Sequence, residues 1–135
     1  MSEFANFVTI QDGEFRMPWW ENQPPRPGDR AVYTKVYSGI DLPDLNARKP
    51  AVLLWKMRNP VSFTMTFWFN GQVSVSTDPG PGERIESYHE IFPGSHLREK
   101  DNELVIAVEG PFYMVFSDVV LMYGASTDGP QVAHR

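Results

Sequence analysis

Imidazole and carboxylate groups gather at Tyr88-His89-Glu90 and at His96, and these side-chain types can ligate a metal ion. On a β-strand, however, neighbouring side chains point to opposite faces of the sheet. His89 and Glu90 therefore cannot ligate one ion unless the strand bulges between them. The sequence predicts no metal site and no cofactor. We expect one histidine to be hydrogen-bonded at the rim of a sheet and the other to lie in an exposed loop.

The strongest candidate for a binding surface is the aromatic, proline-rich loop from Pro18 to Asp29. Indole rings beside amide and charged groups suit a sugar, because its C–H face packs on the ring while its hydroxyls bond the polar groups. Trp and Arg are also enriched in protein–protein interfaces. The alternative is that a tryptophan only closes one end of the core. The ligand-binding residues predicted here are Trp19, Trp20, Asn22 and Arg26.

Trp68 is the fifth predicted ligand-binding residue. In the segment from Val61 to Phe69, apolar and hydroxyl side chains alternate up to Thr66, so they lie on opposite faces of a strand. Trp68 shares the hydroxyl face with Ser62, Thr64 and Thr66. Left uncovered, that face would bind a ligand or another subunit. The alternative is that the Trp19-Trp20 loop covers it.

Catalytic groupings are thin, and we predict no catalytic residues. Ser117, Asp118 and His89 supply the residue types of a triad, but no Gly-x-Ser-x-Gly turn is present to expose a nucleophile. Glycoside hydrolysis needs two carboxylates facing each other across a cleft. Nothing in the spacing of the acidic residues pairs them. Enzymatic activity is therefore not expected.

Composition limits the partners. The 135 residues carry a net charge of −5 and no long run of Lys or Arg, which argues against a nucleic acid partner. No apolar stretch approaches the ~20 residues of a membrane span, and the N-terminus lacks the pattern of a signal peptide. The chain has no cysteine, which fits a reducing compartment. We expect a soluble, cytoplasmic protein without a membrane partner.

The elements that would position these residues are strands. Asn70-Gly71 separates two alternating segments, and this dipeptide favours the type I′ turn of a β-hairpin. The segment from Ala51 to Met57 begins with apolar residues at both parities, which predicts a strand buried on both faces. A turn is expected at Asp12-Gly13, and a bulge or a crossing between sheets at Ser117-Asp118. The expected strands cover residues 4–10, 14–17, 31–38, 51–57, 61–69, 72–77, 84–92, 102–109 and 112–123.

Eight or nine strands without a substantial helix predict an all-β fold in a chain of this length. We prefer a two-sheet antiparallel sandwich of jelly-roll type to a closed barrel. The predicted domain covers residues 1–123. Residues 124–135 are polar and are expected to form a disordered tail.

A resemblance covers about residues 63–123. A strand, Asn70-Gly71, a second strand and a Pro/Gly loop lead to His89-Glu90-Ile91-Phe92-Pro93, and a later strand begins at Asn102. This order resembles jelly-roll accessory domains of the galactose-binding-like kind, in which a turn asparagine precedes a Leu-x-Ile/Val-x-Val strand. The resemblance implies the sandwich fold and transfers no ligand-binding residue.

The sequence therefore favours a non-catalytic, lectin-like binding or assembly module. Its expected partner is a carbohydrate-like small molecule or a protein, bound through the aromatic loop. Two alternatives stay open: a structural protein that forms a homo-oligomer through an uncovered sheet face, and a small β-barrel enzyme that uses His89 and Glu90.

Overall fold

The computed structural model describes residues 2–17, 31–59, 64–78, 82–110 and 114–127. Within them the chain forms eight strands and one short 3-10 turn, and no helix there is long and apolar enough to cross a membrane. The elements are β1 (Ser2–Met17), β2 (Ala31–Ile40), β3 (Ala51–Asn59), β4 (Thr64–Phe69), β5 (Gln72–Thr77), β6 (Gly82–Phe92), η1 (Gly94–His96), β7 (Asn102–Gly110) and β8 (Met114–Thr127).

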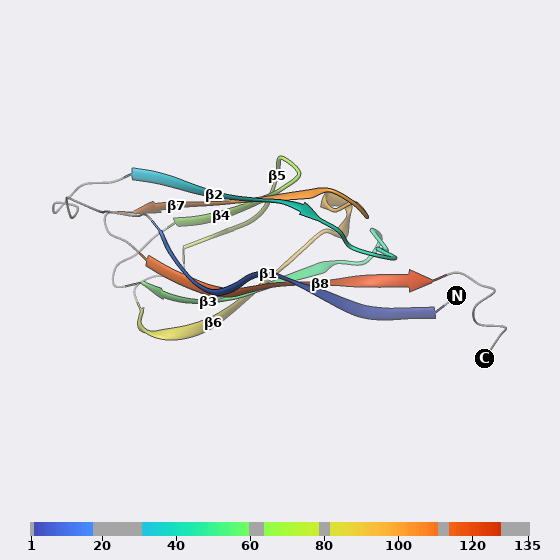
Figure 1. The fold of residues 1–135 in the computed structure, drawn as a ribbon, viewed down its shortest axis with the longest axis horizontal. Coiled ribbons are helices and arrows are strands. Elements are labelled where there is room, and N and C mark those ends of the chain that lie inside the picture. Colours follow the sequence, from blue (N-terminus) through green and yellow to red (C-terminus); the bar gives the residue numbers. More distant parts are fainter. Residues whose placement is uncertain (1, 18–30, 60–63, 79–81, 111–113, 128–135) are drawn as a thin grey trace.

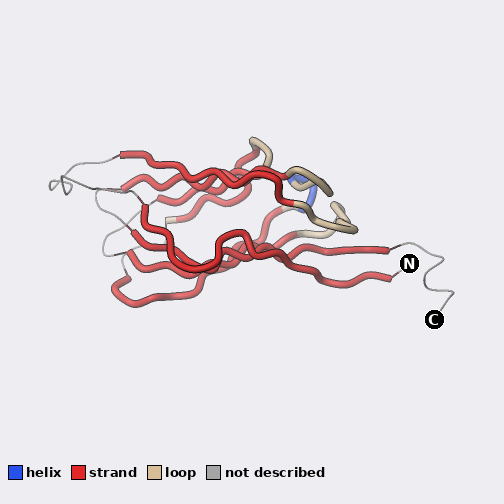
Figure 2. The backbone as a smooth tube through the Cα atoms, viewed as in Figure 1, coloured by secondary structure: helices blue, strands red, loops and turns tan. Residues whose placement is uncertain are grey.

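The strands form two four-stranded antiparallel sheets that lie face to face (Figure 1). One sheet has the order β1-β8-β3-β6 and the other β2-β7-β4-β5. Among the described strands, only β4 and β5 are consecutive in the chain and neighbours in one sheet. Figure 2 shows that strands make up almost all of both layers. The predicted two-sheet jelly-roll sandwich is confirmed.

The core follows the predicted alternation. Met65, Phe67 and Phe69 are fully buried, and the φ angles of Asn70 and Gly71 are 53° and 80°, as the type I′ turn requires. Phe63, which was predicted to join this set, lies outside the described residues. The largest buried side chains of the opposite sheet are Trp55, Phe92 and Phe116.

Asn70, in the turn between β4 and β5, and Asn102, at the start of β7, belong to one hydrogen-bond network that connects three loops. The side-chain amide of Asn102, fully buried, donates to the carbonyl oxygens of Ile40 (2.9 Å) and Arg98. Its own oxygen accepts from the backbone N–H of Arg98 (2.9 Å) and from the side chain of Asn70 (2.9 Å). Asn70 in turn accepts from the backbone N–H of Glu103 (2.9 Å). Every polar atom of the buried Asn102 side chain is therefore bonded, which is the condition for burying an amide at low cost.

The structure corrects two expectations about strand boundaries and decides between the two alternatives at Ser117-Asp118. Asp12-Gly13 does not end a strand: β1 continues through it with shifts of register, because Gly13 accepts a φ of 81°. Ser117-Asp118 does form a bulge, with Asp118 at a φ of 52°, but β8 stays in one sheet along its whole length. That strand also continues past Tyr123, because residues up to Thr127 pair with the start of β1. The disordered tail predicted from Gly124 is wrong for residues 124–127, and residues 128–135 lie outside the described part.

Candidate functional site

Trp68 lies on the outer face of the sheet β2-β7-β4-β5, half-buried among its neighbours. The strand pairings place one apolar residue of each strand side by side across the sheet, in the order Val36, Val105, Trp68 and Val73. The two outer members, Val36 and Val73, are 52% and 55% exposed. A four-residue apolar row with an indole in it therefore faces outward.

A second row of small and hydroxyl side chains runs beside the apolar row. Its members, again one from each strand, are Thr34, Ala107, Thr66 and Ser76. Beyond it, Thr64 pairs with Glu109 on the same face. Of this second row, only Ala107 is buried. We call the two rows together the Trp68 platform.

The platform can supply two kinds of contact. The indole and the valines offer apolar surface, and the three hydroxyls both donate and accept hydrogen bonds. Exposed carboxylates at Glu103 and Glu109 project from β7 at opposite ends of the platform. The arrangement suits a neutral ligand with an apolar face and polar edges.

The structure places one of the five predicted ligand-binding residues, Trp68, on this surface. Trp19, Trp20, Asn22 and Arg26 lie outside the described residues, so their predicted role stays a prediction.

The histidine and carboxylate cluster is dispersed by the fold. His89 and Glu90 pair with successive residues of β3 and so point to opposite faces. His96 lies in η1, where its Nδ1 is 2.8 Å from the Ser74 hydroxyl. In the part of the chain that the structure describes, no group of three or more His, Cys, Asp or Glu side chains is arranged to hold a metal.

A second apolar surface, which was not predicted as a site, covers the outer face of the sheet β1-β8-β3-β6. Its apolar residues form a row across the four strands, in which Phe7, Met122 and Ile91 are exposed and Val52 is half-buried. The sequence feature that marks this surface is the start of β3, where both odd and even positions are apolar. It was interpreted as burial on both faces, whereas Val52 and Leu54 are only half-buried because nothing described covers them.

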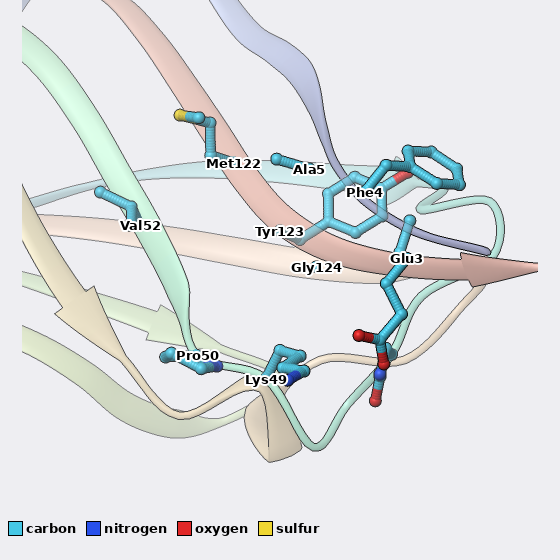
Figure 3. A pocket seen from close by; sticks show the side chains of 11 residues that line it. Glu3, Phe4, Ala5, Lys49, Pro50, Val52, Met122, Tyr123 and Gly124 are labelled. Carbon is cyan, nitrogen blue, oxygen red and sulfur yellow. The ribbon is translucent and has the colours of Figure 1, made fainter. Parts of the chain in front are cut away.

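Beside this row the surface is hollowed, with a volume of about 380 Å³ (Figure 3). The hollow is lined by residues of β1, β3 and β8 and of the loop before β3, whose Lys49 side chain lies against Gly124. Side chains around it in Figure 3 include Glu3, Phe4, Lys49, Pro50 and Met122.

Comparison with known proteins identifies the fold. No protein-family model and no curated protein sequence matches the chain. Among solved structures, a family 35 carbohydrate-binding module from an environmental isolate aligns with a TM-score of 0.54 over 96% of this chain and 100% of the module. The fold is that of a jelly-roll module. The sequence identity is 12%, so the likeness extends to the fold alone.

Two further solved structures are similar in fold. The CBM36-1 domain of a multidomain xylanase, from the hindgut metagenome of Trinervitermes trinervoides, aligns at 11% identity and a TM-score of 0.50 over 92% of this chain and 100% of that domain. Dimeric latent PorU from Porphyromonas gingivalis aligns at 8% identity and a TM-score of 0.58 over 93% of this chain. The chain spans only 13% of the PorU structure. The predicted resemblance to jelly-roll accessory domains is confirmed at the level of fold.

Proposed function

We propose that this chain is a non-catalytic carbohydrate-binding module whose ligand lies on the Trp68 platform. The observation that carries the proposal is the pair of rows on one exposed sheet face: an apolar row containing an indole beside a row bearing three hydroxyls. A sugar ring has the matching chemistry, with an apolar C–H face and a periphery of hydroxyls.

The sheet also makes the platform rigid before any ligand arrives. Trp68 belongs to β4, which is hydrogen-bonded on one side to β7 and on the other to β5. Binding to a surface held in this way loses little conformational entropy. The three gaps between four strands span about 14 Å, enough for a short oligosaccharide to contact all of them. The jelly-roll fold shared with carbohydrate-binding modules supports the proposal.

The proposal extends to the aromatic loop. Trp19, Trp20, Asn22 and Arg26 would add stacking and polar contacts to those of the platform, as their residue types suggest. A protein ligand at the same residues is the competing hypothesis.

Affinity electrophoresis in gels containing soluble xylan, mannan, β-glucan or galactan tests the proposal. We expect at least one polysaccharide to retard the wild-type chain and Trp68→Ala to abolish that retardation. Ile85→Ala is the matched control, because it truncates an exposed apolar side chain on the other sheet. Retardation by none of the four, or equal retardation of Trp68→Ala and wild type, would count against the platform.

A further inference from the structure

The apolar row on the sheet β1-β8-β3-β6 is unusually exposed. Phe7 and Ile91, at its two ends, are each 66% exposed, and Met122 is 38% exposed. The next row toward the bulge of β8 contains Thr9, Val120, Leu54 and His89, with no acidic or lysine side chain. Large contiguous apolar patches of this kind mark interaction surfaces. We call the row Phe7, Met122, Val52 and Ile91 the ridge.

The hollow lies on the other side of the ridge, one row further along the strands. Its lining includes Ala5 and Gly124, which pair with each other across β1 and β8. Neither residue has a side chain larger than a methyl group. The loop before β3 closes the far side, and Lys49 packs so tightly there that a Cβ on Gly124 would lie 2.7 Å from the Lys49 Cβ. The ridge and the hollow are therefore adjacent on one face of the sheet.

We propose that a second copy of this chain docks on this face, with the ridge of each copy in the hollow of the other. Consider a two-fold axis that lies in the plane of the contact, runs across the strands and passes between the ridge and the row of Ala5 and Gly124. This axis places the ridge of each copy over the row of Ala5 and Gly124 in the other copy. One such contact thus generates its reciprocal, as a closed symmetric dimer requires. The proposal does not depend on what the Trp68 platform binds.

The charge of this face and the area of the proposed contact both fit a second copy of the chain. From the row of Ala5 to the row of Thr9, the strand residues of the outer face include one titratable side chain, His89, among the described residues. The hollow itself is lined by one acidic and one basic residue, Glu3 and Lys49, whose opposite charges leave it with no net charge. The ion pair of Lys56 and Asp118 (3.8 Å) lies outside the overlap. Four strands and about eight residues along each give a footprint of roughly 500 Å² per copy, or roughly 1,000 Å² in total. That is the lower limit for a specific interface, so we expect a reversible dimer.

Sedimentation velocity over a hundredfold range of concentration tests the proposal on the whole chain. The wild type should shift from monomer toward dimer as the concentration rises. Ile91→Lys should weaken the dimer at least about tenfold, because it buries an unpaired charge in the contact. Ile85→Lys is the matched control: Ile85 is 62% exposed on the same strand and face, but beyond Lys56, so this variant should dimerise as the wild type does.

Ala5→Leu separates a fitted contact from general hydrophobic adhesion. Ala5 is exposed, so the change leaves the fold intact but fills the hollow. A ridge-in-hollow dimer should be at least about tenfold weaker, whereas adhesion would strengthen with the added apolar surface. A wild type that stays monomeric, a tighter Ala5→Leu dimer, or equal effects of Ile85→Lys and Ile91→Lys would each overturn the proposal.

Discussion

The tryptophans of β3 and β4 point in opposite directions, because strand alternation places one on the inner face of its sheet and the other on the outer face. Trp55 points inward and is 2% exposed. The centroid of its ring lies 4.8 Å from the ring centroid of Phe67 and 5.7 Å from that of Tyr88. Trp68 points outward. Trp55→Ala should therefore lower the free energy of unfolding by about 3–5 kcal/mol, and Trp68→Ala by about 1 kcal/mol. Urea denaturation of both variants checks this. Equal losses would mean that Trp68 is a core residue and would remove the basis of the platform.

The buried Asn102 gives a second test at the residue scale. Asn102→Asp keeps the shape of the side chain but turns the carbonyl oxygens of Ile40 and Arg98 toward a carboxylate, which cannot donate to them when ionised. We expect a loss of about 2–4 kcal/mol at neutral pH, measured by urea denaturation. Gln72→Glu, on the exposed start of β5, makes the same chemical change and should alter stability by less than about 0.5 kcal/mol. A comparable effect of the two changes would show that the network is dispensable.

Tyr37 provides a test by pH. Burial raises the pKa of its phenol from 10.0 to about 12, and the hydroxyl donates to the Gln11 side chain (2.6 Å). The folded state thus favours the neutral phenol, so this contribution to stability is complete below pH 10 and is lost as the pH rises toward 12. A ¹³C NMR titration of labelled tyrosine, assigned with Tyr37→Phe, should show a resonance with a midpoint near 12. A midpoint near 10 would show that the phenol is hydrated.

At the scale of elements, the β4–β5 hairpin depends on backbone conformation at Gly71. Apart from Gly71 itself and its two chain neighbours, no atom lies within 4 Å of where a Cβ on Gly71 would be, so a side chain meets no steric obstacle from the rest of the fold. Its φ of 80° alone makes the position unfavourable for other residues. Gly71→Ala should cost about 1 kcal/mol, and Gly71→Val more, because a β-branched residue resists this region. Thermal denaturation measures both. A Gly71→Val protein as stable as the wild type would refute the type I′ assignment.

The elements that could be predicted from the sequence are those whose pattern is local. Met65, Phe67 and Phe69 alternate with hydroxyls, and Asn70-Gly71 sets the register, so hairpin and buried face followed directly. The continuation of β1 through Gly13 could not be predicted, because Asp-Gly serves a bulge as well as a turn. The outer apolar face was missed for another reason. Burial of Val52 depends on what covers the sheet, and no local pattern records that.

At the scale of the whole molecule, the two proposed surfaces lie on opposite layers of the sandwich. A dimer through the ridge and hollow would hold two Trp68 platforms facing away from each other, each available to a different polysaccharide chain of the same matrix. Linked sites gain apparent affinity through effective concentration.

The consequence is measurable. Ile91→Lys should dissociate faster than the wild type from a polysaccharide-coated sensor, at least about tenfold, while its Kd for a soluble oligosaccharide stays unchanged. A loss of affinity for the soluble oligosaccharide as well would show that Ile91 acts on the platform itself, contrary to the separation of the two surfaces.

An NMR titration tests whether the outer face of the sheet β2-β7-β4-β5 binds sugar. The ¹⁵N-labelled protein is titrated with a hexasaccharide fragment of whichever polysaccharide retards it in the gel. We predict that the largest shift changes occur at the indole N–H of Trp68 and at the backbone amides of Thr66, Val73 and Val105. Changes confined to the opposite sheet, around Val52 and Met122, or the absence of any change at the Trp68 indole, would show that sugar does not bind on the Trp68 platform.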